Sequence, residues 1–403
     1  MSDANSFNAN QSDPIVIVSL ARTPMGAFQG DFLNVSAPQL GAVAVRAVVE
    51  RAKIKAEQVD ELIFGNVLQA GVGQAPARQA ALGGGLTAAT GCTTVHKVCG
   101  SAMKATMLAH DLLLAGSNQV MIAGGMESMS NAPYLLPKAR GGYRLGHGQM
   151  LDHMFFDGLE DAYQKGRLMG TFAEECAESY GFTREQQDDF AIRSTQRAQE
   201  AIKSGRFAWE IAAVSVSSRK GEVLIEQDEQ PLKAQIDKIA GLKPAFKKDG
   251  TVTAANSSSI SDGAAALLLM RASHAKQLGV TPIAKILGHA THAQAPNLFT
   301  TAPVFAMQKL LARIGWSAES VDLYEINEAF AVVTMAAMRE LNLPAEKVNI
   351  HGGACALGHP IGASGARIIA TLLGALRHYG KKRGVASLCI GGGEATAMAF
   401  EML

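Results

Sequence analysis

A cysteine stands where a strand pattern gives way to a helix pattern, in the segment VCGSAMK at residues 98–104. The first turn of a helix carries a partial positive charge, so we expect Cys99 to have a lowered thiol pKa and an exposed sulfur. Gly100 beside it would leave room for a substrate carbonyl to approach. An isolated cysteine is more often a buried, unreactive residue. The neighbours of Cys99 therefore favour a nucleophile.

A single histidine lies in a glycine-rich loop ahead of a helix, in the segment GGACALGHPIGASG at residues 352–365. Glycines at this density let the backbone approach a ligand closely, and His359 supplies a group that titrates near neutral pH. A core histidine and a phosphate-binding loop are the alternatives, but the Lys-Ser/Thr ending of a P-loop is missing. We therefore expect His359 to take part in chemistry.

Two more groups follow strand patterns. Asn327 and Glu328 come after one such pattern, and Cys389, followed by three glycines, ends another. Since ligands of open α/β sheets bind at the carboxyl ends of strands, these side chains can converge there with Cys99 and His359. Taken singly, Asn327 is equally well explained as a turn residue and Cys389 as a small core residue.

These groups need a framework of alternating strands and helices. Short apolar runs at 15–18, 62–64 and 120–122 alternate with helical patterns at 39–52 and 102–114. That alternation predicts an α/β fold.

The same order of signals returns in the last third of the chain. A strand pattern at 282–287 precedes a helical pattern at 304–313, and residues 321–325 echo 59–63. Two further correspondences follow, between 361–366 and 99–102 and between 388–394 and 122–127. We therefore predict two similar α/β halves.

The stretch between the halves, about 130–258, lacks the alternation of strand and helix patterns and looks like an inserted loop domain. It contains a helical pattern at 184–203. Thr183 and Gln186 form a capping box at the start of that pattern, so a helix begins there.

Composition excludes several classes of protein. The 403 residues are 48% hydrophobic and 18% charged, which indicates a compact chain of two or three domains. Lys and Arg number 37 against 36 Asp and Glu, which argues against a nucleic-acid or membrane-surface protein. The longest strongly apolar stretch is far below the roughly 18 residues of a membrane span. The polar first 14 residues resemble a frayed tail rather than a secretory signal.

The five cysteines are odd in number and form no CxxC pair. This pattern suggests neither a disulfide framework nor a zinc site, and we predict no metal. A reducing cytosol fits this usage best, so we expect a cytoplasmic protein.

Together the motifs resemble the thiolase family, specifically its biosynthetic-type acetyl-CoA acetyltransferases, from residue 22 to residue 393. The matching segments are VCGS at 98–101, NEAF at 327–330, GHP at 358–360 and CIGG at 389–392. The resemblance implies the thiolase fold, in which duplicated α/β halves form a five-layer αβαβα sandwich. It also implies an N-terminal half at 1–129 completed by about 259–281, a CoA-binding loop domain at 130–258 and a C-terminal half at 282–403.

The resemblance implies a role for each matched residue. Cys99 takes the acyl group, His359 activates it, Cys389 acts as acid and base, and Asn327 holds a catalytic water. Backbone N–H groups of Cys99 and Gly391 would hold the oxyanion of the attacked thioester. The implied reaction is the reversible Claisen condensation of two acetyl-CoA to acetoacetyl-CoA and CoA, or thiolysis of a 3-ketoacyl-CoA, by an acyl-cysteine ping-pong mechanism.

The resemblance also places the substrate. Residues 246–258 are similar to the segment that contacts pantetheine in the family, although alone they read as a turn with a solvated basic face. The implied CoA-binding and acyl-pocket residues are Leu159, Met169, Phe246, Ala254, Ser258, Ala329 and Phe330. One departure is Leu168, where close biosynthetic relatives carry a histidine, so the preference for short acyl chains is open.

The family implies a homotetramer, a dimer of dimers, with CoA thioesters as substrates and no separate cofactor. Two alternatives remain. A ketoacyl synthase shares the duplicated fold but pairs its cysteine with two histidines, whereas only one histidine here lies in a matching motif. A non-catalytic acyl-CoA-binding homologue would not need Cys99, His359 and Cys389 together.

Overall fold

The computed structural model describes residues 12–403 except 219 and 220. Residues 1–11 of the expected polar tail lie outside this part. Within the described residues, no helix combines the length and apolar character that a membrane span requires.

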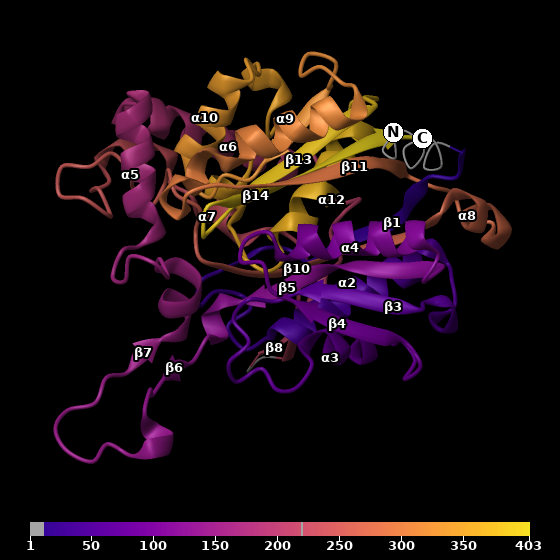
Figure 1. Ribbon diagram of the computed structural model, residues 1–403, viewed down its shortest axis with the longest axis horizontal. Helices are drawn as coiled ribbons and strands as arrows, with labels where there is room; N and C mark the ends of the chain where they lie inside the picture. The colour runs from indigo at the N-terminus through magenta and orange to yellow at the C-terminus, as the bar shows by residue number, and fades with distance from the viewer. Residues whose placement is uncertain (1–11, 219–220) are drawn as a thin grey trace.

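One mixed sheet of ten strands runs through the molecule (Figure 1). Its strands are β1 (Ile15–Arg22), β2 (Gly26–Ala27), β3 (Glu61–Gly65), β4 (Gly91–Val95), β5 (Val120–Ser128), β10 (Ser261–Arg271), β11 (Ala284–Ala293), β12 (Leu323–Ile326), β13 (Arg383–Ile390) and β14 (Glu394–Met402). The order is β12-β13-β14-β11-β1-β10-β5-β3-β4, with β2 paired to β10.

The strand order repeats on the two sides of a seam. On one side β3 is parallel to β5, and β5, β10 and β1 follow in antiparallel order. On the other side β12 is parallel to β13, and β13, β14 and β11 follow in antiparallel order. The two sets join at β1 and β11, where Val16 pairs with Lys285. The predicted repeat of α/β units is confirmed.

Helices cover both faces of each half-sheet. They are α2 (Ala37–Ala52), α3 (Pro76–Gly83), α4 (Ser101–Ala115), α8 (Ala272–Leu278), α9 (Ala302–Ile314), α10 (Ala331–Glu340) and α12 (Ser364–His378), and the short helix α11 (Ala354–Leu357) lies in the loop ahead of α12. Figure 1 shows α4 and α12 between the purple N-terminal strands and the yellow C-terminal strands.

The hydrophobic core shows the same layers. Side chains of α4 and α12 share one core cluster with both half-sheets, whereas α2 and α3 pack on the outside of one half-sheet and α9 with α10 on the other. The strands β1, β5, β10 and β13 are buried on both faces along nearly their whole length, which explains their continuous apolar runs. The five-layer αβαβα sandwich is confirmed.

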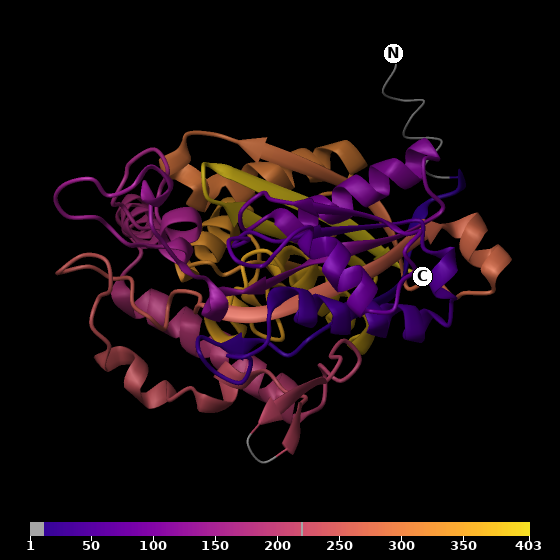
Figure 2. The ribbon, with the colours of Figure 1, turned by 90° about the horizontal axis from the view of Figure 1, so that it is seen from below.

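Residues 129–260 add no strand to the large sheet among those described. This inserted segment holds α5 (Met169–Tyr180), α6 (Arg184–Lys203), α7 (Glu229–Lys233) and the strand pairs β6 (Tyr134–Leu135) with β7 (Leu151–Asp152) and β8 (Val214–Ser218) with β9 (Gly221–Ile225). The β6–β7 hairpin projects from the body in Figure 1, and the pink part of the segment lies along one side of the strands in Figure 2.

The predicted helix start at Thr183 is confirmed. Its hydroxyl accepts a hydrogen bond from the Gln186 backbone N–H at 3.2 Å, and the Gln186 side-chain oxygen accepts from the Thr183 N–H at 3.0 Å. The helix α6 then spans the predicted residues 184–203.

A buried arginine joins the end of β1 to the inserted segment. The Arg22 Nε donates to Glu210 Oε1 at 2.6 Å, and its two terminal nitrogens donate to both Asp228 carboxylate oxygens at 2.7 and 2.9 Å. All three side chains are fully buried. A guanidinium that makes two parallel hydrogen bonds to a carboxylate fixes both the position and the orientation of that carboxylate, and so of the inserted segment that carries it.

We expect Arg22→Met to lower the free energy of unfolding by about 3–5 kcal/mol, because Glu210 and Asp228 would remain as uncompensated buried charges. Urea unfolding followed by circular dichroism measures this. The matched control is Arg144→Met, since Arg144 is exposed in the β6–β7 hairpin loop. An equal, small effect of both substitutions would contradict the role given to the buried pair.

Candidate active site

A cavity of about 570 Å³ gathers side chains from both halves and from the inserted segment. Its volume falls in the range of small-molecule sites. Of the residues selected from the sequence, it is lined by Cys99, Leu159, Leu168, Met169, Phe246, Ala254, Ser258, Ala329, Phe330, His359, Cys389 and Gly391. The structure therefore brings together nearly all of them, and most of the wall is apolar.

The Cys99 turn is strained. Val98 has φ 45°, a left-handed conformation that a β-branched residue rarely adopts. Strain of this kind concentrates at functional sites. A Cβ on Gly100 would lie 2.3 Å from Ile390 Cδ1. This glycine lets the turn pack against the end of β13, and the room that it would leave for a substrate carbonyl stays a prediction.

The expected lowering of the Cys99 pKa is wrong. Burial raises the pKa of this thiol to about 11, although the backbone N–H groups of Gly391 and Cys99 donate to the sulfur and lower it in part. Loss of water around the thiolate outweighs the two donors and the helix terminus. The resting thiol of Cys99 is neutral, and two N–H groups already surround it.

Cys389 lies at the end of β13 beside Cys99. Burial raises the pKa of the Cys389 thiol well above its ordinary value, and a negative charge on Cys99 raises it further. Cys389 therefore holds its proton in the resting protein. All five cysteines are free, as their spacing predicted.

Hydrogen bonds determine the tautomer of His359. The Ser364 hydroxyl donates to the Pro360 carbonyl at 2.9 Å, so it has no second hydrogen for the imidazole. It must accept from His359 Nδ1–H, which lies 2.5 Å away. The Nε2 atom consequently carries a lone pair, and it is buried without a hydrogen-bond partner among the described residues.

The imidazole stays neutral at physiological pH. Burial and, to a smaller extent, the positive charge of Arg367 together lower the pKa of His359 to about 3. A buried, neutral ring with a free Nε2 is suited to accept a proton from a neighbouring group.

Asn327 is buried and is absent from the described cavity lining. Its amide oxygen accepts from Arg367 Nη2 at 3.3 Å, so its amide nitrogen faces away from the guanidinium. That nitrogen has no partner among the described residues. Arg367 is in turn paired with Glu325 at 3.6 Å, and all three side chains are buried. The arrangement leaves an N–H donor available for a water.

Glu328 does not join the cavity, contrary to expectation. Its carboxylate accepts from Ser194 Oγ at 2.7 Å, Asn349 Nδ2 at 2.8 Å and the Cys355 N–H at 3.0 Å. It thereby fastens α6 and the 349–355 segment to the end of β12. The strand position predicted only proximity, and the direction of the side chain is set by these donors.

The comparisons with known proteins cover nearly the whole chain. The thiolase N-terminal domain matches residues 15–273 and the thiolase C-terminal domain matches residues 280–402. The chain belongs to the thiolase family. It is 50% identical over 392 residues to acetyl-CoA acetyltransferase 2 of Arabidopsis thaliana, covering 96% of this chain and 97% of that one. It is 48% identical over 389 residues to the Cupriavidus necator acetyl-CoA acetyltransferase, covering 96% and 99%.

Solved thiolase structures agree in fold. The Bacillus anthracis acetyl-CoA acetyltransferase superposes with a TM-score of 0.94 at 40% identity, covering 97% of this chain and 99% of that one. A thiolase of Ascaris suum in complex with coenzyme A superposes with a TM-score of 0.91 at 41% identity, covering 97% and 100%.

A buried carboxylate clamps the two halves of this thiolase at the cavity. Glu127, in β5, accepts from the backbone N–H groups of Val67, Leu68 and Gly362 at 3.0, 3.1 and 2.8 Å and from Asn66 Nδ2 at 2.8 Å. A Cβ on Gly362 would lie 2.5 Å from a Glu127 oxygen. At this position the glycine-rich loop approaches the protein itself, not a ligand as the sequence suggested.

Several lining residues of the thiolase cavity carry no motif. They are Phe28, Ile260 and Phe299. A second cavity of about 510 Å³ adjoins the first at Val98 and Gly391, and its polar lining includes His96, His153 and Asp157. Apolar and loop residues of this kind give no sequence signal of their own, because only the tertiary fold turns them toward one space.

We expect Arg367→Gln to raise the pKa of His359 toward its ordinary value near 6.5, because it removes a nearby positive charge. At pH 6 the thiolase activity should then fall by up to about fourfold relative to pH 8, beyond any loss in the unaltered protein. The pH profile of kcat/KM measures this.

Arg367→Lys is the matched control, because it keeps the charge while it changes the geometry of the contacts with Asn327 and Glu325. Circular dichroism confirms that both variants fold. An unshifted acidic limb in folded Arg367→Gln would contradict this electrostatic role.

Proposed function

We propose that this thiolase is an acetyl-CoA C-acetyltransferase. It condenses two acetyl-CoA to acetoacetyl-CoA and CoA, and it catalyses the reverse thiolysis of 3-ketoacyl-CoA. The observation that carries the proposal is one cavity lined by Cys99, Cys389 and a histidine whose Nε2 bears a lone pair. Relatives named acetyl-CoA acetyltransferases and a thiolase neighbour in complex with coenzyme A support the substrate class.

In the first half-reaction the Cys99 sulfur attacks the carbonyl carbon of acetyl-CoA. His359 Nε2 takes the thiol proton as the S–C bond forms, and the N–H groups of Gly391 and Cys99 stabilise the developing oxyanion. The bond to the CoA sulfur then breaks, and Cys389 gives that sulfur its proton. The products are acetyl-Cys99, free CoA, an imidazolium and the Cys389 thiolate.

The second half-reaction uses these charges. The Cys389 thiolate removes a proton from the α-carbon of a second acetyl-CoA, and its high pKa makes it a strong base. The enolate oxygen accepts from the protonated His359 Nε2 and from a water held by the amide nitrogen of Asn327. The enolate carbon attacks the acetyl carbon, the bond to Cys99 breaks, and its sulfur regains the proton from His359.

We propose that pantetheine runs along Phe246, Ala254 and Ser258. Ala329 and Phe330 lie beside these residues, since the Ser258 N–H donates to the Ala329 carbonyl at 2.9 Å and the Phe246 and Phe330 rings are in contact. Leu159 and Met169 would surround the acyl group. Six of these seven side chains are apolar and Ser258 supplies a hydroxyl, which suits a CoA arm that carries amide groups. Both half-reactions use only groups of the chain and the substrates, so CoA thioesters are substrates and no separate cofactor is required.

We propose a cytoplasmic homotetramer, a dimer of dimers, without nucleic-acid or membrane partners. The projecting β6–β7 hairpin supports an assembly contact, because Tyr134, Leu136, Leu145 and Met150 are exposed there. The free cysteines fit a reducing compartment.

The two alternatives are not favoured. A ketoacyl synthase needs a second histidine at the reacting cysteine, and the main cavity is lined by His359 alone among the described histidines. A non-catalytic acyl-CoA-binding protein would gain nothing from the Cys99 and Cys389 pair or from the tautomer of His359. Cleavage of acetoacetyl-CoA by free CoA tests the activity directly.

We expect the two half-reactions to separate in variants. Cys389→Ala should still form acetyl-Cys99 from acetyl-CoA, at a reduced rate, whereas carbon–carbon bond formation nearly stops. His359→Ala should slow the acetylation itself, since loss of a general base commonly costs about 10²–10⁴ in rate. Single-turnover kinetics and peptide mass spectrometry measure both steps.

Cys92→Ala is the matched control for removing a thiol, because Cys92 lies in β4 outside the cavity lining. An acetyl group on Cys92 or Cys355, or none at all, would overturn the assignment of Cys99. Near-normal condensation by Cys389→Ala would overturn the division of labour.

We expect Leu168 to favour longer or less polar acyl groups. It lies just before α5 and lines the cavity. Leu168→His should lower activity on longer 3-ketoacyl-CoA relative to acetoacetyl-CoA, by up to about fourfold per methylene that loses apolar contact. A panel of acyl-chain lengths measures the ratio, with Leu224→His on exposed β9 as the control. An unchanged ratio would show that Leu168 does not set chain length.

A further inference from the structure

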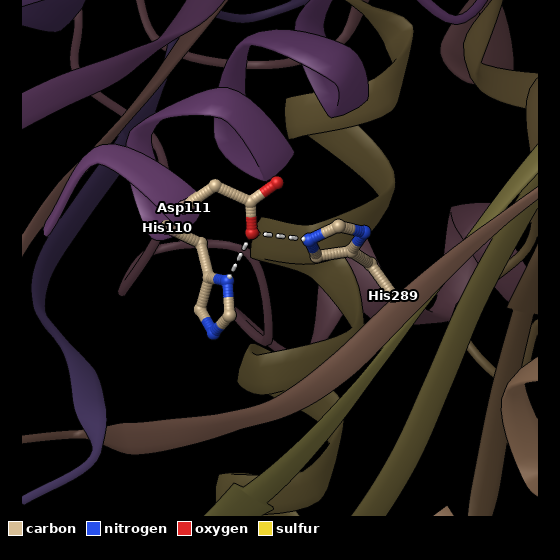
Figure 3. A group of neighbouring side chains, drawn as sticks. All are labelled: His110, Asp111 and His289. Carbon is tan, nitrogen blue, oxygen red and sulfur yellow. Dashed lines mark hydrogen bonds and ion pairs between the residues drawn. The ribbon is translucent and has the colours of Figure 1, made fainter. Parts of the chain in front are cut away.

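A second group of reactive side chains lies between the two halves, away from the cavity. His110 and Asp111 are in α4, and His289 is in β11. Figure 3 shows the Asp111 carboxylate pointing between the two imidazoles. Its Oδ1 lies 3.0 Å from His110 Nδ1 and 2.8 Å from His289 Nε2. Three good metal ligands therefore meet at one point.

This cluster is separate from the reaction. The three residues do not line either described cavity beside Cys99. His110 and Asp111 follow the start of α4 by nine and ten residues, which at 1.5 Å per residue is roughly 14 Å along the helix. The mechanism proposed above gives them no task, although two of their three side chains are mostly buried.

We propose that His110, Asp111 and His289 bind a divalent transition metal ion of the Zn²⁺ class. Two imidazole nitrogens and one carboxylate oxygen form the donor set that Zn²⁺ accepts in three-ligand sites, whereas Mg²⁺ and Ca²⁺ prefer oxygen alone. Asp111 is half exposed, so a water completes the tetrahedron from the solvent side.

The distances suit such an ion after a small adjustment. Bonds of about 2.0–2.1 Å in a tetrahedron place neighbouring ligand atoms roughly 3.3 Å apart. The three atoms lie within 4.8 Å of one another, and the two contacts to Asp111 are shorter than this spacing. Asp111 must therefore move outward to accommodate the ion, and its exposure permits this movement.

The residues around this cluster predict a moderate affinity for the metal ion. His110 Nε2 is buried without a hydrogen-bond partner among the described residues, so no acceptor there orients the ring. Lack of an outer partner commonly costs about 10–100-fold in metal affinity. The bound ion would join α4 of one half to β11 of the other, and it would stabilise the folded chain in proportion to its occupancy.

Equilibrium dialysis of the full chain against ZnCl₂, after treatment with a chelator, gives the stoichiometry. We expect one ion per chain. His289→Ala and Asp111→Asn should each weaken binding by at least about 100-fold, more than the loss of an outer partner. His292→Ala is the matched control, since His292 is also in β11 but outside the cluster, and it should bind as the unaltered chain does.

Cobalt distinguishes this site from the active-site thiols. Co²⁺ bound by nitrogen and oxygen shows visible absorption without the near-ultraviolet charge-transfer band of a thiolate ligand. We expect that spectrum, and we expect it to disappear in His289→Ala while thiolase activity and circular dichroism are unchanged. No stoichiometric binding, a thiolate band, or equal binding by His289→Ala would overturn the proposal.

Discussion

The reacting groups come from opposite halves of the chain, so the site depends on one contact between them. The Glu127 carboxylate holds the loop after β3 and Gly362 of the His359 loop with three backbone N–H groups. Burial raises the pKa of Glu127 to about 7, yet its donors favour the charged form. Because a buried acceptor that loses its donors is costly, this carboxylate resists any separation of the two loops.

The layered architecture explains why such a clamp suffices. The helices α4 and α12 share one core between the half-sheets, and each begins next to a reacting residue, Cys99 or His359. Packing along α4 and α12 sets the angle between the two helices. The contacts at their N-terminal ends then set the positions of Cys99 and His359. The Gly100 contact with Ile390 shows how tight that end is, since a Cβ there would lie 2.3 Å from Ile390 Cδ1 and the isoleucine side chain would have to shift.

Much of the fold follows from the sequence because burial leaves a strong pattern. Strands covered on both faces read as continuous apolar runs, and the repeat of those runs predicted the two halves. The capping box at Thr183 located the start of α6 to the residue. The position of β10 between β1 and β5 has no comparable local signal. It depends on pairing between residues that lie more than a hundred positions apart in the chain.

At the site, it was easier to predict which residues take part than to predict where their side chains point. The motifs around Cys99, His359 and Cys389 led to the cavity, whereas Glu328 turned out to face α6 and Asn327 to lie against Arg367. The direction of each depends on donors contributed from distant segments. Lining residues such as Phe28 and Phe299 carried no motif because apolar side chains are selected by shape alone.

The largest error of the sequence analysis was the predicted lowering of the Cys99 pKa. The physical cause of that error also explains how the protein protects its nucleophile. A helix terminus alone lowers a thiol pKa, but the apolar wall around Cys99 raises it, and the same wall lowers the pKa of His359. Both shifts oppose an ion pair between Cys99 and His359, so thiol and imidazole stay neutral. In the proposed reaction the charge on Cys99 appears only as its sulfur bonds to the thioester, where it passes to an oxygen held by backbone N–H groups. A neutral thiol is also a poor target for oxidants, because the thiolate is the reactive form.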